Sequence, residues 1–306
     1  MNVLRNNSAF FFGLAVLALF GFSIGSFFGN YWVVVALNFA MWIALTQSWA
    51  IFSGLTGYIS LGHVVFYGLG AYTVAISYKI LPLWFSVPLG GLVAAVFALI
   101  ISVPALRVRG PYFVILTFGI SELVKFIVLN LETHFGKSSR LLFGAPSAET
   151  VLYAMIVLAV VASVMMQLVK VSTFGRGLLA IQGDEISAET VGIPIVRFKV
   201  IAFSIAAIIP GMVGGLMVLR STYFEVLQIF NPLFSFTIVT MAIIGGSSDT
   251  RGPIFGAAFL VFLSELLASS APRLYMILLG GFLIFFVIFA PNGIVGILRK
   301  STKGRS

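Results

Sequence analysis

Several residue types that support chemistry are missing or rare in this sequence. It contains no cysteine, which excludes a disulfide framework and thiol chemistry. With only two histidines, His63 and His134, and no cysteine, we do not expect a histidine- or thiolate-rich metal site. Charged residues make up only 9% of the chain, whereas roughly one quarter is usual in a soluble domain. A soluble globular fold is therefore excluded.

Enzyme signatures are missing as well. The sequence has no P-loop, no H-E-x-x-H and no C-x-x-C. We therefore expect neither an enzyme nor a bound cofactor, and no ATP site of the Walker type. A membrane-embedded enzyme is a poor alternative because no nucleophile or metal cluster appears. Any energy for uphill work must come from another protein or from an ion gradient.

Apolar residues dominate what is present, at 60% of 306 residues, which is more than a globule can hide from water. Lipid accepts such a surface, and a helix that crosses a bilayer needs about 20 mostly apolar residues. We therefore predict an all-α integral membrane protein, a single domain built as a polytopic bundle of about ten transmembrane helices. The predicted spans are 9–29, 31–52, 55–78, 83–106, 111–131, 150–169, 200–219, 230–246, 253–271 and 274–290. We interpret the first as a retained helix rather than a signal peptide.

The net charge of +9 comes from basic residues concentrated in the short connections. In a soluble protein this charge would indicate nucleic acid, but here the positive-inside rule is the better interpretation. With the N-terminus inside, the inner connections hold the larger share of the basic residues. We predict that both termini are cytoplasmic, that the number of crossings is even, and that the partner is membrane lipid rather than nucleic acid.

The stretch 54–63 interrupts apolar sequence with glycines and hydroxyl groups. Glycine frees the backbone from helical geometry, and such backbone is tolerated at membrane depth only where protein or a water-filled cavity satisfies it. Thr56, Gly57, Ser60 and His63 are therefore candidates for lining a translocation path. An ordinary loop that enters a helix explains the pattern equally well. The span 55–78 then either crosses fully or is broken and re-entrant.

Three charged residues fall inside predicted spans, where they are costly and should face protein or water. Glu122 and Lys125 are three residues apart and can partly neutralise each other. Glu265 has no local partner. One interpretation is a proton relay in an ion-coupled pump, with Glu122 as a further path candidate. A structural hydrogen bond between helices is favoured for Glu265, because no histidine or aspartate network surrounds it.

The inner connection 170–199 has an acidic segment where basic loops are usual. Ile181, Glu185, Ala188 and Gly192 fall on helical spacing, and Gly192 followed by Pro194 is a helix stop. We predict one short cytoplasmic helix over 177–191, presenting an apolar face and acidic side chains to a docking partner. The alternative is a solvated connector.

Taken in order, these residues resemble the M-type permease subunit of branched-chain amino acid ABC transporters. The resemblance runs from about residue 38 to 291, and its single motifs are weak while the ordered set is specific. It is carried by LTGYISLGH at 55–63, GLGAY at 68–72, LRVRGPYF at 106–113, Glu122 with Asn130, GRG at 175–177, Ala180-Ile181, Asp184-Glu185, Ala188 with Gly192, Lys199 with Phe203, Gly211 with Gly214-Gly215, and the glycines of 245–257.

The resemblance implies a pore-forming subunit in a bacterial inner membrane, which carries branched-chain or related amino acids. It implies a second permease subunit in a heterodimer, two cytoplasmic ABC ATPases and a periplasmic substrate-binding protein. The segment 170–199 then corresponds to the ATPase-coupling loop, with Arg176, Ile181, Asp184, Glu185, Ala188 and Gly192 in contact with the ATPase.

The chain departs from the family pattern at Gln182, at 136–140 and at 248–251, and it fits the E-A-A-x3-G pattern of general importers only loosely. These departures leave the substrate open. Urea and short-amide permeases share much of the pattern, and an ion-coupled secondary transporter is an alternative of another class.

Overall fold

The computed structural model describes residues 8–27, 29–135, 140–142, 146–221, 223–268, 272–289 and 293–296. Most of them are helical, and a single two-residue pairing of strands is present among them. The elements are α2 (Ser8–Phe27), α3 (Asn30–Trp49), the π-helical turn η1 (Ala50–Gly54), α4 (His63–Ser77), α5 (Leu83–Ala105), α6 (Pro111–His134), β1 (Arg140–Leu141), α7 (Ala148–Val171), α8 (Thr173–Gly183), α9 (Glu185–Thr190), α10 (Ile195–Arg220), β2 (Tyr223–Phe224), α11 (Val226–Ile229), α12 (Pro232–Gly245), α13 (Arg251–Ala268) and α14 (Pro272–Phe289).

Helix starts follow local sequence signals. α6 begins with Pro111, whose missing N–H costs nothing in the first turn, and the preceding Gly110 takes a φ of 59° that favours glycine. The Ser147 hydroxyl caps α7 by accepting from the Thr150 N–H at 3.3 Å. Asn231 caps α12 in the same way. Proline, glycine and capping residues therefore set where these apolar helices begin.

Each predicted apolar run overlaps one of the helices α2 to α7, α10 or α12 to α14, so the prediction of an all-α membrane protein is confirmed. Six helical stretches of the described chain have the length and apolar composition to cross a bilayer: Asn30–Gly54, Leu83–Ala105, Pro111–His134, Ala148–Val171, Ile195–Arg220 and Val226–Gly245. Shorter apolar helices occupy Phe10–Ser23, His63–Ser77 and Ile277–Phe286. The count of about ten crossings stays a prediction.

The outside of the bundle is apolar, as lipid requires. Large apolar side chains stand more than half exposed on several helices, and examples are Leu92, Ile100, Ile115, Leu123, Phe262 and Ile284. In water such a surface would associate. In a bilayer it needs no cover.

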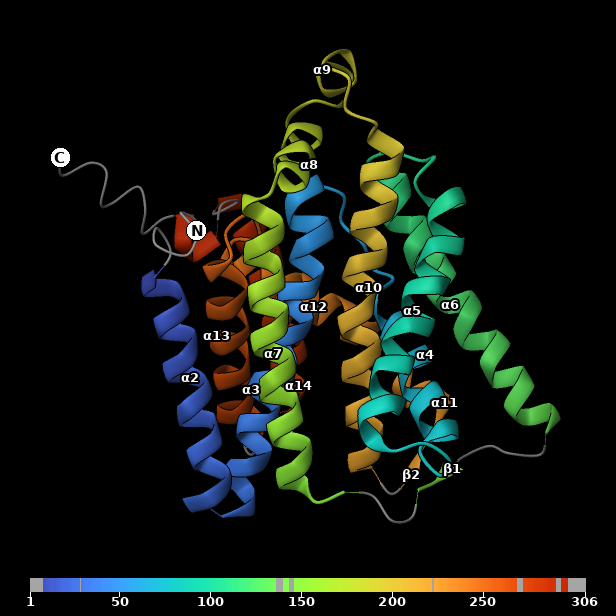
Figure 1. Ribbon diagram of the computed structural model, residues 1–306, viewed down its shortest axis with the longest axis vertical. Coiled ribbons are helices and arrows are strands. Elements are labelled where there is room, and N and C mark those ends of the chain that lie inside the picture. Colours follow the sequence, from blue (N-terminus) through green and yellow to red (C-terminus); the bar gives the residue numbers. More distant parts are fainter. Residues whose placement is uncertain are drawn as a thin grey trace.

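Helix α10 packs against both α4 and α5 near the middle of the bundle (Figure 1). Glycines make this close approach possible. A Cβ placed on Gly70 of α4 would lie 1.9 Å from the carbonyl oxygen of Gly211 in α10, and one on Gly211 would lie 2.7 Å from the carbonyl oxygen of Gly90 in α5. The three backbones are therefore in direct contact, which is how helices pack tightly in lipid.

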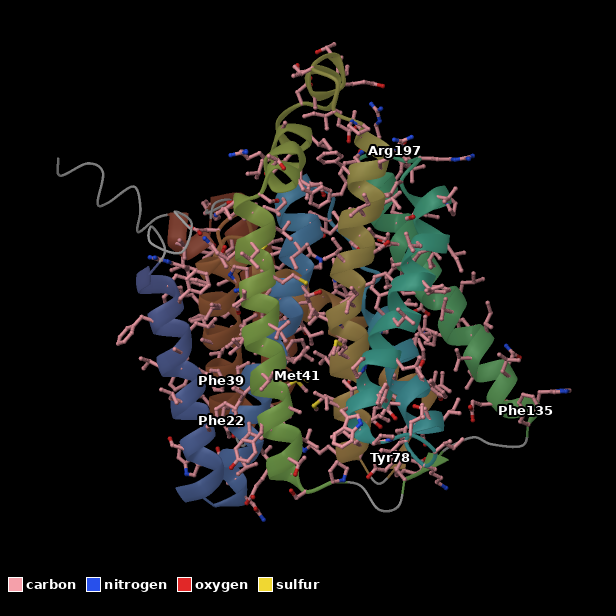
Figure 2. All side chains as sticks on the ribbon, viewed as in Figure 1. Phe22, Phe39, Met41, Tyr78, Phe135 and Arg197 are labelled. Carbon is pink, nitrogen blue, oxygen red and sulfur yellow. The ribbon has the colours of Figure 1, made fainter. Side chains whose placement is uncertain are left out.

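The two ends of the bundle differ. Figure 1 shows α8 and α9 projecting from one end, with α9 as the outermost element, and β1 and β2 pairing at the opposite end. In Figure 2 Arg197 lies at the end that carries α8 and α9, while Tyr78 and Phe135 lie at the other. The connection 170–199 is thus the largest structured projection on its side.

The predicted span 55–78 is broken rather than a continuous helix. The turn η1 ends at Gly54, the backbone from Gly57 to Gly62 is not helical, and α4 begins only at His63. Gly57 has a φ of 76°, which explains the glycine there. The 15 residues of α4 measure only about 22 Å at 1.5 Å per residue, so α4 alone is too short to cross a hydrocarbon layer of about 30 Å.

Candidate functional site

The connection between α7 and α10 forms two helices, so the prediction of one helix over 177–191 is wrong. The chain breaks at Asp184, whose backbone is extended (φ −159°, ψ 120°). Its carboxylate accepts a hydrogen bond from the Ser187 N–H at 2.6 Å and so caps α9. Gly183 precedes this cap and is a poor helix former. One helix therefore ends and a new one starts at Asp184, although the helical spacing of apolar residues continues through this position.

The predicted helix stop at Gly192 is confirmed. Gly192 has a φ of 88°, its N–H donates to the Glu189 carbonyl at 2.9 Å, and the Ile193 N–H donates to the Ala188 carbonyl at 3.1 Å. These two bonds define a Schellman motif. Gly192 has no neighbour that a Cβ would meet, so its role in the structure is conformational.

The predicted docking residues divide into an inner and an outer set. Ile181 and Ala188 are buried against their own chain, and Ala188 is only 4% exposed. Arg176 and Asp184 are exposed. A docking face built on Ile181 and Ala188 would therefore have to compete with packing inside this chain.

We call the connection 172–194 the tip. Its two exposed large apolar side chains were not selected from the sequence. Ile186 is 68% exposed and Val191 is 82% exposed, and both lie on or next to α9. Their proximity to an N-cap and a C-cap could have marked them, since capped short helices hold their side chains in fixed positions.

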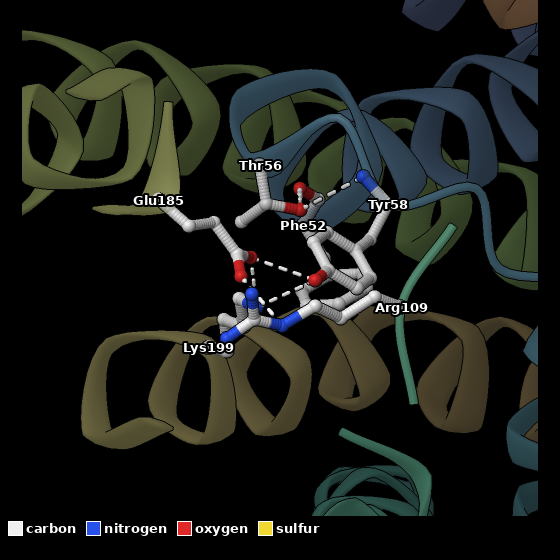
Figure 3. A network of polar contacts seen from close by, with 6 residues as sticks. All are labelled: Phe52, Thr56, Tyr58, Arg109, Glu185 and Lys199. Carbon is white, nitrogen blue, oxygen red and sulfur yellow. Dashed lines mark hydrogen bonds and ion pairs between the residues drawn. The ribbon is translucent and has the colours of Figure 1, made fainter. Parts of the chain in front are cut away.

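Glu185 is the centre of a polar network that joins four parts of the chain. Figure 3 shows Tyr58, Arg109 and Lys199 converging on its carboxylate. The Tyr58 hydroxyl donates to Glu185 Oε1 at 2.7 Å, and the Lys199 ammonium pairs with the same oxygen. Lys199 also donates to the Tyr58 hydroxyl at 2.8 Å and lies 4.0 Å from the centre of its ring. Arg109 Nε forms a looser ion pair with Oε2 at 3.2 Å, without hydrogen-bond geometry.

These contacts change the role expected for Glu185. From the sequence we expect Glu185 to meet an ATPase, but its carboxylate contacts basic residues of its own chain. α9 is thereby tied to the non-helical segment through Tyr58, to α10 through Lys199, and to the turn before α6 through Arg109. The side chain of Lys199 is almost fully buried, and a buried ammonium needs a carboxylate partner. The sequence did not identify this pair, because the burial of Lys199 is visible only in the fold.

The acidic groups of the tip are stabilised in their ionised form. Partial burial raises the pKa of Glu185, but hydrogen bonds from Lys199 and Tyr58 and the charges of Lys199 and Arg109 outweigh it, and the pKa lies below its ordinary value. Hydrogen bonds from Ser187 lower the pKa of Asp184. Both carboxylates are therefore charged at neutral pH.

The non-helical segment is held by its own hydroxyl groups. The Thr56 hydroxyl donates to the Phe52 carbonyl at 2.7 Å, and Ser60 Oγ accepts from the Gly62 N–H at 3.2 Å. Thr56 and Ser60 are buried, whereas Gly57 is exposed beside Gln182. The four candidates of this segment therefore lie together on one stretch, mostly packed in protein in this conformation.

His63 is the exception within the segment, because it is fully buried and neither ring nitrogen has a hydrogen-bond partner. Its ring packs edge-on against Phe66. Leaving a buried polar group unsatisfied typically costs about 1–3 kcal/mol. Packing alone gives no reason for a histidine at this position.

Glu122 lies apart from these residues on α6, paired with Lys125 as its spacing predicts. Glu265 on α13 accepts a hydrogen bond from the Tyr31 hydroxyl of α3 at 2.5 Å. This contact is the bond between helices that we favoured over a proton relay for Glu265. The sequence could not identify Tyr31, because the two residues are 234 positions apart.

Comparisons with known proteins agree with this architecture. A family model described as "branched-chain amino acid transport system / permease component" matches residues 31–287. The high-affinity branched-chain amino acid transport system permease protein LivM of Salmonella typhimurium is 29% identical over 90% of this chain and 72% of its own length. LivM of Escherichia coli is 29% identical over 82% of this chain and 66% of its own length.

A more distant similarity covers a shorter stretch. The L-arabinose transport system permease protein AraH of Escherichia coli is 30% identical over 26% of this chain and 24% of its own length. No solved structure gives a significant match.

Proposed function

Since this chain belongs to the family of branched-chain amino acid transport system permease components, we propose that it forms the translocation pathway of an ABC importer for branched-chain or related amino acids. The family is one of transport permeases and not of enzymes. In the proposed assembly the chain pairs with a second permease subunit. Two cytoplasmic ABC ATPases supply the energy, and a periplasmic binding protein delivers the substrate.

The proposed topology places α8 and α9 in the cytoplasm of a bacterial cell, with about ten crossings of the inner membrane and both termini inside. The basic residues of the connections support it, and so does the common position of α8, α9 and Arg197 at one end (Figures 1 and 2). The terminal segments 1–7 and 297–306 lie outside the described residues.

Reporter fusions test this topology. A fusion within the connection 172–194 and one at Ser306 are expected to give cytoplasmic signals, because both follow an even number of crossings. A fusion in the turn at Lys79 is the matched control and is expected to give a periplasmic signal. A periplasmic signal at Ser306 would contradict the proposed orientation.

One observation carries the proposed coupling: the Glu185 network ties the outermost helix, α9, to the segment 57–62 inside the bundle. An ATPase must act through a cytoplasmic contact, because ATP is there. A helix fixed by two caps and an ion-pair network moves as a unit, whereas a flexible loop dissipates motion. We assign α8 and α9 as the coupling element and the network as its link to the path.

The two ring nitrogens of His63 have no hydrogen-bond partner, which supports assigning residues 57–63 to that path. A buried group without a partner in one conformation is explained if water or substrate reaches it in another. Tyr58 lies on the non-helical segment 57–62 and His63 begins α4 directly after it, so displacement of α9 is transmitted to His63 through five residues of backbone. Thr56, Gly57 and Ser60 lie along the same stretch, whereas Glu122, paired with Lys125, is a weaker candidate.

Cysteine accessibility tests this path, and the cysteine-free chain makes the labelling specific. Single cysteines at Thr56, Ser60 and His63 are buried in this conformation and are expected to react with a polar thiol reagent at least about tenfold faster during ATP turnover. A cysteine at Ala207, buried in α10, is the matched control and is expected to stay protected. If all four cysteines are equally protected during active transport, residues 57–63 are packed in protein and do not line the path.

Uptake by the reconstituted complex tests the proposed function itself. Labelled leucine, isoleucine, valine, other amino acids and urea are supplied with the binding protein, and the proton gradient is collapsed. ATP-dependent uptake of a branched-chain amino acid is the expected result. Uptake of urea alone would make the chain a urea or short-amide permease. Uptake that needs the gradient but no ATP would make it an ion-coupled carrier.

A further inference from the structure

A polar cavity of about 300 Å³ lies between α3, α11, α12 and α13, apart from the Glu185 network and from the segment 57–63. One part of its lining consists of amide, hydroxyl and carboxylate side chains, among them Asn38, Asn231 and Glu265. Another part is apolar and includes Trp42 and Phe234. A mixed lining of this size is typical of a small-molecule site.

Glu265 is the charged group of the cavity. Its Oε1 accepts the Tyr31 hydroxyl at 2.5 Å, and among the residues whose side chains are described no basic group pairs with it. One neutral hydrogen bond leaves most of the acceptor capacity of a carboxylate unused. A carboxylate within a membrane-spanning bundle is expensive to maintain, and it indicates a functional partner of opposite charge.

The amides provide the complementary chemistry. Asn231 Oδ1 accepts the Leu233 N–H at 3.0 Å, which orients its side chain and leaves the amide NH2 free to donate. Asn38 brings a second amide from α3. Amide N–H groups bind carboxylates, whereas the Glu265 carboxylate binds an ammonium. The cavity thus presents groups for both ends of a zwitterion, together with an apolar wall.

We propose that this cavity is a binding site for the free amino acid in transit. Glu265 receives the α-ammonium, Asn38 and Asn231 donate to the α-carboxylate, and Trp42 and Phe234 contact the aliphatic side chain. The inference rests on the proposed transport function and adds the site that recognises the substrate within the membrane.

The position of the cavity suits this role. Phe234 packs against Trp42 and against Tyr67 of α4, with ring centroids 4.8 Å and 4.5 Å apart. The next residue, Ser235, accepts the Val64 N–H at 3.1 Å, directly beside His63. Phe234 and Ser235 therefore bring the α12 wall of the cavity into contact with α4, the helix that begins at His63.

Substrate protection of a cysteine in the cavity tests the proposal. Ser264→Cys places a thiol in the lining of the cavity, and its reaction with a polar thiol reagent is followed in the assembled transporter. Leucine is expected to slow this reaction. 4-Methylpentanoate, which lacks the ammonium, and 3-methylbutylamine, which lacks the carboxylate, are expected to have no effect at the same concentration. Lys79→Cys, exposed in the turn after α4, is the control and should react equally with and without leucine.

A second substitution assigns the ammonium contact. Glu265→Gln in the Ser264→Cys background is expected to raise the half-protecting leucine concentration at least about tenfold, the usual effect of losing a charge-assisted hydrogen bond. Tyr31→Phe in the same background keeps the carboxylate and is expected to keep protection. Equal loss in both variants would reduce Glu265 to a structural role and overturn the assignment.

The remaining outcomes are also decisive. A thiol that stays unreactive in the Ser264→Cys variant, or leucine uptake without protection, would overturn the proposed site while leaving the transport function intact. Protection by leucine in a complex that transports no amino acid would support the site and refute the proposed function. Protection by urea but not by leucine would overturn the zwitterion site.

Discussion

Replacing Glu185 by glutamine is expected to abolish most ATP-driven uptake while the membrane bundle stays folded. The substitution removes the charge that Lys199 and Arg109 share and leaves the buried ammonium of Lys199 without a carboxylate. Removing one partner of a buried pair typically costs about 3–5 kcal/mol. A change of 1.4 kcal/mol is tenfold in an equilibrium, so we expect α9 to detach from the bundle and uptake to fall at least about tenfold.

The chain contains a matched control for this change. Glu189 lies one turn further along α9 and is exposed, so Glu189→Gln alters the same charge on the same helix outside the network. Its uptake is expected to match that of the parent. Proteolysis within the connection 172–194 is measured in both variants, and it should accelerate in Glu185→Gln alone. If the two variants behave alike, the Glu185 network does not couple α9 to the bundle.

The pH dependence of this network follows from the lowered pKa of Glu185. A carboxylate whose pKa is lower in the folded state stabilises that state above its unfolded pKa, about 4.3 for glutamate. The contribution is lost as the pH falls through the folded value. Resistance of the connection 172–194 to proteolysis is therefore expected to be constant from neutral pH to about pH 5 and to decline only in stronger acid. In Glu185→Gln this acid-dependent decline should be smaller, because only the contribution of the Asp184 cap remains.

The sequence was sufficient to locate the apolar helices because burial in lipid depends on local composition. It also located the stop at Gly192, since a left-handed cap is a local property. It failed at Asp184, where two local signals compete: the helical spacing continues, but the aspartate caps a new helix. The cap prevails because its carboxylate satisfies an N–H that a helix start leaves open.

The contacts of the candidate site could not be predicted in the same way. Glu185 meets Tyr58 across 127 positions, and Glu265 meets Tyr31 across 234. Neither pair is marked in the sequence by a periodic spacing or by a motif. The sequence did show that Lys199 lies next to an apolar run and that Glu265 lies within one. A charge in such a place needs a polar partner, and only the fold could identify that partner.

Ile186 and Val191 are the side chains at which we expect the largest effect on assembly. They are exposed apolar groups on the outermost helix and at its C-cap, at 68% and 82%, and the ion-pair network of Glu185 fixes the position of this helix. Amphipathic elements of this kind dock by inserting apolar side chains into a groove, and central apolar contacts contribute most of the binding energy. These two residues replace Ile181 and Ala188 as the proposed contact, because the latter pack against their own chain.

Ile186→Asp and Val191→Asp are therefore expected to lower the affinity for the ATPase at least about tenfold each, since a lost hot-spot contact costs about 2 kcal/mol or more. Both residues are exposed, so the thermal stability of the chain itself should not change. The measurement is copurification of the ATPase together with thermal unfolding of the permease. Ile80→Asp is the matched control: Ile80 is 83% exposed in the turn after α4, away from α9, and the ATPase should be retained.

A tryptophan at Ala188 would be a weaker probe of docking. Ala188 is buried in its own chain, so added bulk disturbs α9 before any ATPase binds, and loss of assembly would have two causes. The aspartate variants separate these causes because they leave the interior of the tip unchanged. If Ile186→Asp and Val191→Asp retain the ATPase as fully as Ile80→Asp does, α9 is a connector. The docking surface must then lie elsewhere at the same end, and Arg107 to Gly110 is the next segment to test.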